Sequence, residues 1–275
     1  MKPALYISFK YEVRETGFFL SFFSLFIISI LALRAKRPRL CESLSEPNHE
    51  GQNTPPPKLT PAGLSSLMCA RICHDLLSPV SALGTAIEVL NDENNPEMHE
   101  DAIELIKSSA GQTSGKLQFL RLAFGAGGST AGRVGLDALE KLVEGQYGGG
   151  KHQFNWNVKV DDIEKLHGRI LLNMMMIAVT SIPRGGEVTV RVEEKAGATI
   201  LTLDATGPKA RIADMIKTTL GGRMPEDGFD GRSIQPFFTA MLVREVKGKV
   251  EFMLSEETAT YIVFIPPAIS PSADV

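Results

Sequence analysis

Two stretches with the periodicity of an amphipathic helix, separated by the polar segment NDENNPEMHED, constrain the fold of this chain most. The second stretch begins at Pro96, a residue favoured at the first position of a helix. Because one helical hairpin has too small a core to be stable alone, the pattern predicts that hairpins of two chains form a homodimeric four-helix bundle. The seam residues of the first arm are Ile72, Leu76, Pro79, Leu83, Ile87 and Leu90, and those of the second are Ile103, Ile106, Ala110, Leu117, Leu120 and Phe124.

His74 lies off the seam of the first arm, about 200° around the helix from Ile72, and is therefore predicted to face solvent. A neutral imidazole nitrogen can attack phosphorus, and a neighbouring carboxylate can orient the ring, fix its tautomer and take up its proton. We expect three catalytic residues: His74 as nucleophile, Asp75 as its orienting acid, and Ser78, one turn further along the same face, as a hydrogen-bond partner. The alternative is a surface histidine without chemistry.

The outer face around His74 is also the predicted docking surface for a partner. Proline cannot donate the helical hydrogen bond, so Pro79 is expected to bend the helix and to free a carbonyl beside the site. Small side chains on this face would let a helix of the partner approach closely. The alternative for each of these residues is an ordinary solvent-exposed position without a role in docking. The predicted docking residues are Arg71, Ser81 and Thr85 on the first arm and Lys116 and Phe119 on the second.

The rest of the chain predicts an α+β two-layer sandwich, with helices on one face of a mixed sheet. Strands are expected over 153–160, 187–193, 199–204, 249–254 and 259–265, and helices over 135–144, 163–182, 210–220 and 235–246. The expected domains are an N-terminal extension over 1–60, the hairpin over 61–126, the sandwich over 133–268 and a tail over 269–275.

The hexapeptide His74–Pro79 resembles the phosphoacceptor box of two-component histidine kinases, and the order of elements in the second domain resembles their ATP-binding domain. The resemblance fails where that domain carries its chemistry. Asn173 matches the first position of the kinase N-box, but Ile177 replaces the Asn that coordinates magnesium, and an aliphatic side chain cannot ligate Mg²⁺. In the next box Ala205 replaces the adenine-binding Asp, although Gly207 matches its first glycine.

An acceptor hairpin followed by a degenerate kinase domain is similar to the ChpT family of alphaproteobacterial histidine phosphotransferases, over residues 59–267. In that family a cytoplasmic homodimer passes a phosphoryl group from the receiver domain of the hybrid histidine kinase CckA to the response regulators CtrA and CpdR, which control the cell cycle. The resemblance implies a phosphotransferase that accepts the group on His74, has no cofactor or metal of its own, and uses the Mg²⁺ of the receiver. The alternatives are an active kinase with divergent nucleotide boxes and a non-catalytic, membrane-anchored dimeric scaffold.

The N-terminal extension contains an uncharged apolar run, Phe18 to Leu33, followed by four basic residues within Arg34–Arg39. One interpretation is a single-span inner-membrane anchor with the rest of the chain in the cytoplasm. The other is upstream sequence from a wrongly assigned start, which would leave a cytoplasmic protein without a membrane association. The family resemblance favours the second interpretation, because the family has no membrane span.

Composition excludes several other classes of protein. The formal net charge of −3 gives no general attraction for nucleic acid, and 43% hydrophobic residues exclude wholesale disorder. Three cysteines exclude a disulfide scaffold. Cys69 and Cys73 are interpreted as small hydrophobic residues, with metal ligation as the alternative. Surface or structural roles are expected for His49, His99, His152 and His167, and a core position for Trp156.

Overall fold

The computed structural model describes residues 59–92, 95–125 and 131–267. By its internal contacts the chain divides into the units Met1–Asn53 and Thr54–Val275, and every described residue belongs to the second unit. The apolar run Phe18–Leu33, with the membrane anchor that it suggested, lies outside the described residues. Within the described ranges, no helix combines the length and the apolar character needed to cross a membrane.

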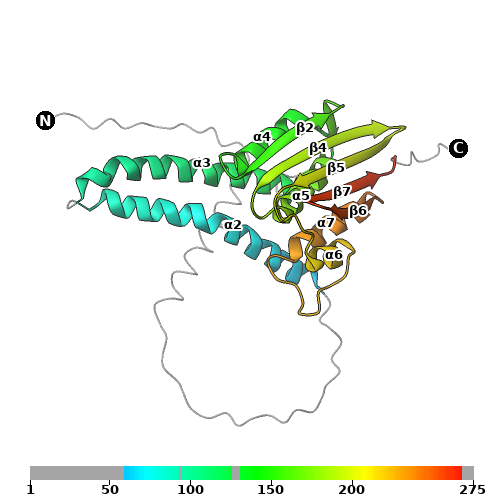
Figure 1. The fold of residues 1–275 in the computed structure, drawn as a ribbon. Helices are drawn as coiled ribbons and strands as arrows, with labels where there is room; N and C mark the ends of the chain where they lie inside the picture. Colours follow the sequence, from blue (N-terminus) through cyan, green and yellow to red (C-terminus); the bar gives the residue numbers. More distant parts are fainter. Residues whose placement is uncertain (1–58, 93–94, 126–130, 268–275) are drawn as a thin grey trace, which may run out of the picture. The chain divides into compact units, whose positions relative to one another are not determined.

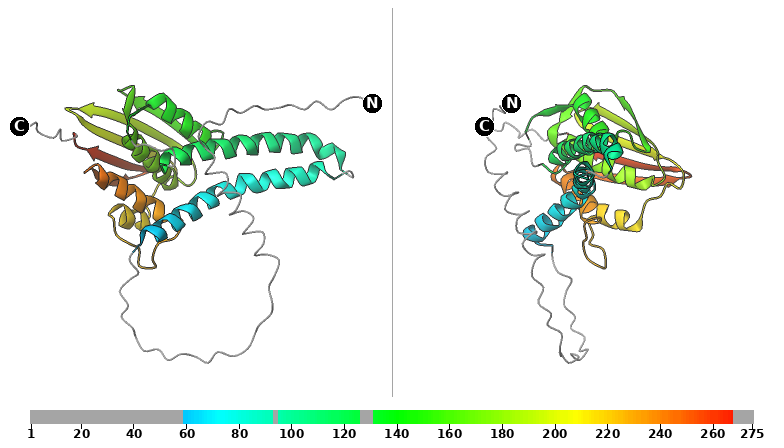
Figure 2. Two further views of the ribbon diagram at one scale, coloured as in Figure 1. Left: turned by 180° about the vertical axis from the view of Figure 1, so that it is seen from behind. Right: turned by 90° about the vertical axis from the view of Figure 1, so that its left-hand side faces the viewer.

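Helices α2 (Pro61–Leu90) and α3 (His99–Ala123) form the predicted hairpin and run side by side, with the short 3-10 helix η1 (Pro96–Met98) at the turn (Figures 1 and 2). The Thr60 hydroxyl caps α2 by accepting a hydrogen bond of 3.0 Å from the N–H of Gly63, which satisfies one of the free donors at the helix start. The two arms and the polar connection between them are therefore confirmed.

The predicted seams are only partly buried within one chain. Ala86, Ala102 and Ser109 are buried on the hairpin, whereas the seam residues Ile87, Ile103 and Leu117 are exposed. Each helix of a hairpin can bury one narrow stripe against its neighbour, and small residues allow the closest approach there. A second apolar stripe of the hairpin remains exposed to solvent. It consists of Leu77, Val80 and Ile87 on α2 and of Ile103 and Leu117 on α3.

The second domain is the predicted two-layer sandwich. Its mixed sheet has the strand order β2-β4-β5-β7-β6, with β2 parallel to β4 and all other neighbours antiparallel. The short strands β1 and β3 pair separately. The elements are β1 (Arg133–Gly135), α4 (Leu136–Tyr147), β2 (His152–Val158), β3 (Asp162–Glu164), α5 (Lys165–Ser181), β4 (Gly186–Lys195), β5 (Ala198–Thr206), α6 (Asp214–Leu220), α7 (Ile234–Glu245), β6 (Lys249–Ser255) and β7 (Thr258–Ile265).

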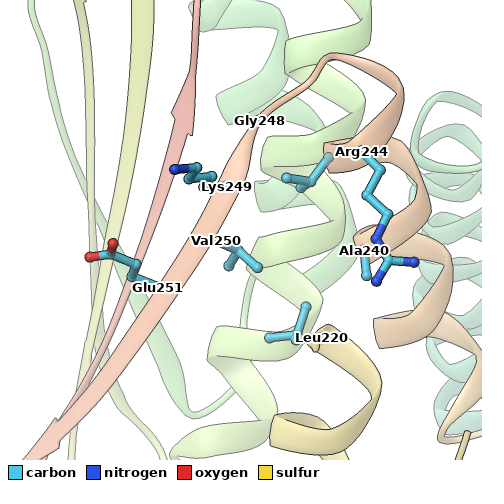
Figure 3. A pocket seen from close by; sticks show the side chains of 8 residues that line it. Leu220, Ala240, Arg244, Gly248, Lys249, Val250 and Glu251 are labelled. Carbon is cyan, nitrogen blue, oxygen red and sulfur yellow. The ribbon is translucent and has the colours of Figure 1, made fainter. Parts of the chain in front are cut away.

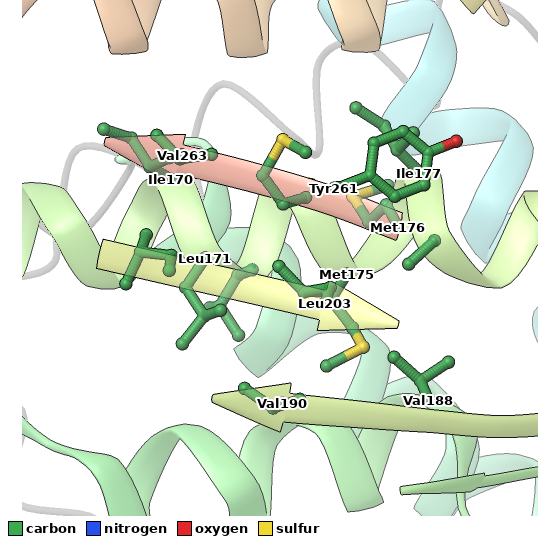
Figure 4. Close-up of a cluster of buried hydrophobic side chains, with 14 of the residues drawn as sticks. Ile170, Leu171, Met175, Met176, Ile177, Val188, Val190, Leu203, Tyr261 and Val263 are labelled. Carbon is green, nitrogen blue, oxygen red and sulfur yellow. The ribbon is translucent and has the colours of Figure 1, made fainter. Parts of the chain in front are cut away.

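The core of this domain lies between the sheet and helix α5. Alternate residues of each strand point to the helix layer, so that Val188, Leu203 and Tyr261 meet Leu171 and Met175 of α5 (Figure 4). Helix α5 also contacts α7 and α3 on its other sides. Because it is covered on several sides, α5 is apolar over most of its circumference, and it carries both Asn173 and Ile177 in this buried setting.

The C-terminal end of α3 packs into the core of the second domain. Phe119 is fully buried, and its ring meets that of Tyr147 edge to face, with 5.8 Å between the centroids. Helices α3 and α4 cross closely at Gly115, where an added Cβ would lie 2.0 Å from the Gly145 carbonyl oxygen. The prediction that Phe119 belongs to the docking surface is therefore wrong, because the residue faces away from the hairpin seam into a neighbouring domain.

Candidate functional site

The His74 ring stands on the outer face of α2, and its side chain is 79% exposed. Its Nδ1 atom lies 3.3 Å from Oδ1 of Asp75. An ionised carboxylate can only accept a hydrogen bond, so this contact favours the tautomer in which Nδ1 carries the proton. The lone pair is then on Nε2, the ring nitrogen that this contact leaves free for a nucleophilic attack.

Asp75 is held from its other side as well. Its Oδ2 accepts a 2.9 Å bond from Nε of Arg71, and the two side chains are only 14% and 19% exposed. Nη1 of Arg71 donates to the carbonyl oxygen of Gly231, 3.3 Å away in the loop before α7. Arg71 is thus engaged within the chain, and its geometry does not support the predicted docking role.

A lysine from the second arm replaces the backbone hydrogen bond that proline removes. In a regular helix the N–H of residue 79 would donate to the carbonyl of residue 75, but Pro79 has no N–H. Nζ of Lys116 donates to that Asp75 carbonyl at 3.3 Å. The expectation of a freed carbonyl beside the site is met, and Lys116 lies next to the site as predicted, although its part in docking stays a prediction.

The remaining predicted residues of this face, Ser78, Ser81 and Thr85, are exposed together with His74. In the described part of the chain Ser78 makes no hydrogen bond to the His74 ring, so its catalytic role stays a prediction. Cys69 and Cys73 are free and exposed rather than packed as small hydrophobic residues. Over residues 59–92, 95–125 and 131–267, no cluster of three or more histidine, cysteine or acidic residues is suited to hold a metal ion.

Asn173, the residue that matches the kinase N-box, is fully buried and makes structural hydrogen bonds. Its Nδ2 donates to the carbonyl oxygens of Ala123, at 2.7 Å, and of Arg169, at 2.9 Å. Its Oδ1 accepts a 3.0 Å bond from Nε2 of Gln235 on α7. The side chain therefore ties the end of α3 to α5 and α7, and sequence reasoning missed Gln235 as its partner.

The other degenerate positions are part of the fold. Ile177 and Ala205 lie in the hydrophobic core. The neighbouring Asp204 points to the face of β5 opposite to that of Ala205. There its carboxylate pairs with Arg191 and accepts a 2.7 Å hydrogen bond from the Thr260 hydroxyl. Gly207 lies so close to the neighbouring turn that an added Cβ would be 2.3 Å from the Gly185 carbonyl oxygen.

A cavity of about 290 Å³ opens elsewhere in the same domain, between α7 and strand β6 (Figure 3). Arg244, Leu220, Ala240 and Val250 have their side chains on the side of β6 that faces α7, whereas the side chains of the lining residues Lys249 and Glu251 lie on the other side of the strand. None of the four box positions lines it. This cavity is therefore distinct from the place where the resemblance to kinases would locate a nucleotide.

Two further residues take the structural roles that were expected. His167 is buried in the first turn of α5, and this burial lowers its pKa below the ordinary histidine value. Trp156 is partly buried and packs against the core of the second domain. Neither residue contributes to the face that bears His74.

Three comparisons place the chain among known proteins. Residues 136–258 match the family described as the histidine phosphotransferase C-terminal domain. The protein phosphotransferase ChpT of Brucella abortus (strain 2308) is 34% identical over 209 residues, which is 76% of this chain and 97% of that protein. A solved structure of a bacterial phosphotransferase superposes with a TM-score of 0.67 at 31% identity, over 76% of this chain and 98% of its own. The chain thus belongs to the ChpT family of histidine phosphotransferases.

Proposed function

We propose that this protein is the histidine phosphotransferase of a multistep phosphorelay and that His74 carries the phosphoryl group. Nε2 of His74 attacks the phosphorus of an aspartyl phosphate in a receiver domain, the bond from phosphorus to the aspartate oxygen breaks, and a bond from phosphorus to Nε2 forms. The proton stays on Nδ1, and its hydrogen bond to the Asp75 carboxylate stabilises the positive charge of the phosphorylated ring. The reverse sequence delivers the group to the aspartate of a second receiver.

One observation carries this proposal: the exposed imidazole is oriented by a carboxylate that is itself held in place. A receiver domain is a large partner, so its phosphoaspartate can be reached only by a nucleophile that projects from the surface. The small exposed side chains of Ser78, Ser81 and Thr85 around His74 leave room for such an approach. Membership of the ChpT family supports the same reaction class.

We infer that the Mg²⁺ needed for transfer is bound by the receiver and that this chain binds no ATP. The side-chain amide of Asn173 is used in three hydrogen bonds within the fold, and Ile177 and Ala205 are apolar where a kinase has a magnesium ligand and an adenine partner. The phosphoryl group would therefore come from another protein instead of a nucleotide.

We also propose that the protein is a cytoplasmic homodimer. The uncovered stripe of Leu77, Val80, Ile87, Ile103 and Leu117 gives the hairpin an apolar face that a second hairpin can bury in a four-helix bundle. For partners, we propose the receiver domain of a hybrid histidine kinase similar to CckA as donor. As acceptors, we propose response regulators similar to CtrA and CpdR that control the cell cycle.

The test follows the label from a receiver domain that carries a radioactive phosphoryl group on its aspartate. We expect the wild type to become labelled and His74→Ala to remain unlabelled, while His99→Ala, which changes a histidine on the same hairpin, becomes labelled like the wild type. Equal labelling of His74→Ala and the wild type would refute the proposal. Labelling of the wild type by ATP in the absence of other proteins would favour the active-kinase alternative. If neither the wild type nor the two variants become labelled, the non-catalytic scaffold is favoured.

A further inference from the structure

We propose that Arg71 is a positioning residue through which the loop between α6 and α7 sets the orientation of the phosphoacceptor. The kinetic part of this inference rests on the proposed transfer to His74. Arg71 lies one helical turn before Asp75 and touches neither the His74 ring nor any reacting atom. It acts on the ring through the Asp75 carboxylate, which it holds from the side opposite to the imidazole.

The Arg71 guanidinium makes two different contacts at once. Nε donates to Oδ2 of Asp75 at 2.9 Å, and Nη1 donates to the carbonyl oxygen of Gly231 at 3.3 Å, 160 positions further along the chain. A planar guanidinium has several donors in a fixed arrangement, so the direction of one bond constrains the direction of the other. Movement of the Gly231 carbonyl therefore changes how Asp75 can be held.

The turn that presents the Gly231 carbonyl is well fixed. Oδ1 of Asp230 accepts bonds from the backbone N–H of Ser233, at 2.7 Å, and of Arg232, at 3.0 Å, and it also accepts a 2.6 Å bond from the Ser233 hydroxyl. The hydrogen bonds from Ser233 lower the pKa of the Asp230 carboxyl, so that it stays ionised to lower pH than an ordinary aspartate. Asp230 is thus a remote position at which the turn can be loosened without a change at the acceptor site.

This arrangement gives the degenerate domain a task in the reaction. In the described structure α2 also contacts α7, the helix that this turn precedes. The loop then contributes an orienting group to the acceptor site without touching the phosphoryl group. A partner that binds or displaces this loop would change the orientation of Asp75 and, through it, the tautomer that leaves Nε2 of His74 free.

The experiment combines Arg71→Ala, Arg71→Lys, Asp230→Ala and the double variant of Arg71→Ala with Asp230→Ala. With a phosphorylated receiver domain as donor, we expect Arg71→Ala to lower the maximal labelling rate about tenfold, with an unchanged half-saturating receiver concentration. Asp230→Ala should lower the rate about threefold in the wild-type background and have no further effect in Arg71→Ala. Arg71→Lys keeps a positive charge for Asp75 but cannot bond Asp75 and Gly231 at the same time. Its labelling rate should therefore equal that of Asp230→Ala.

The control is Asp214→Ala, which removes an exposed carboxylate of the same domain that pairs with Lys217 and is not linked to α2. It should leave the labelling rate unchanged, and thermal unfolding should show that every variant is folded. Effects of Arg71→Ala and Asp230→Ala that multiply in the double variant would overturn the inference. A raised half-saturating concentration at an unchanged maximal rate would also overturn it, because Arg71 would then act in docking.

A second measurement separates this inference from the proposed function. Nitrogen-15 NMR of the histidine rings should show a proton mainly on Nδ1 of His74 in the wild type and a larger share of the other tautomer in Arg71→Ala and Asp230→Ala. If the wild type accepts no label, the proposed function fails, and the ring spectra still decide the coupling. Identical His74 ring spectra in all variants would overturn the coupling even if labelling occurs.

Discussion

Two polar sites of this molecule have opposite designs. At the proposed acceptor site on α2, the His74 ring is exposed and its hydrogen-bond partner Asp75 is largely buried and also bonded to Arg71. At the position on α5 that matches the kinase N-box, Asn173 is buried with its amide engaged, and the neighbouring box positions are apolar. His74 is thus placed where a partner protein can reach it, whereas Asn173 is placed where it holds helices together.

Asn173 shows that a residue can match a binding motif in sequence and still serve only the fold. An amide that could face a ligand is costly to bury unless each of its polar atoms finds a partner. Asn173 finds them in Ala123, Arg169 and Gln235, so it now joins the hairpin, α5 and α7. A residue retained from a kinase-like pattern is therefore weak evidence for the kinase reaction.

The largest effect is expected from Asp75→Ala, which removes the orienting carboxylate and leaves His74 in place. We expect the labelling rate to fall by about 10²–10⁴-fold, because the ring loses its fixed tautomer and the acceptor of its Nδ1–H hydrogen bond. A single-turnover labelling time course measures this loss, and size-exclusion chromatography should show an unchanged assembly. The control Asp137→Ala removes an exposed carboxylate that pairs with Lys141. An unchanged rate in Asp75→Ala would remove its proposed role.

Introducing the asparagine of the kinase N-box at position 177 should destabilise the fold. Ile177→Asn replaces a buried aliphatic side chain by an amide without a partner, so we expect the free energy of unfolding to fall by about 3–5 kcal/mol. Ile177→Val, which keeps the site apolar, should cost only about 1 kcal/mol. Denaturant titration measures both values. Binding of ATP by Ile177→Asn, measured by calorimetry, would contradict the structural interpretation of this site.

Asn173→Ala tests the same region from its polar side. The change removes three hydrogen bonds and leaves the Ala123 carbonyl short of a partner inside the protein, whereas Nε2 of Gln235 keeps its bonds to the backbone carbonyl of residue 173 and to Thr239. We expect a loss of about 2–3 kcal/mol in the free energy of unfolding. Asn155→Ala on the exposed face of β2 is the matched control and should change it by less than about 0.5 kcal/mol. Equal losses in the two variants would mean that the Asn173 bonds contribute little.

The smallest effect concerns the two kinds of histidine, exposed His74 and buried His167. Because burial lowers the pKa of His167, the unfolded chain takes up a proton at this residue before the folded chain does. Its contribution to the free energy of unfolding is therefore complete above about pH 6.5 and falls at lower pH, by at most about 1.4 kcal/mol per pH unit. Denaturant titrations between pH 7.5 and 5.5 should show a shallower decline in His167→Leu. The same slope in both proteins would contradict this prediction.

Much of the fold follows from sequence periodicity. Helical spacing predicted α2 and α3, and alternation predicted β4, β5 and β7 close to their observed ends. The start of α6 was placed four residues early, at residue 210 instead of Asp214, because local pattern alone places helix ends poorly. The predicted seams are only partly buried within one chain, and burial of the exposed seam residues Ile87, Ile103 and Leu117 by a second hairpin stays a prediction.

The candidate site was predictable where its chemistry is local in sequence. His74 and Asp75 are adjacent, so their contact follows from a short motif. Phe119 was misplaced because its burial depends on Tyr147 and α4, which lie in another domain. The link from Arg71 to Gly231 spans 160 positions and involves a backbone carbonyl, which leaves no mark in residue identity. Long-range contacts of this kind become visible only in the structure.

The bond between Lys116 and the Asp75 carbonyl fixes how far the two hairpin helices can slide past each other. A shift of α3 by one helical turn, about 5.4 Å, would carry the ammonium group off the carbonyl that Pro79 leaves unpaired. The bond thus opposes sliding at the level of the reactive imidazole. The two helices are thus held at one relative height beside His74, so every receiver proposed to dock on this face would meet the same arrangement of the two helices, and the choice between donor and acceptor would lie with the receivers.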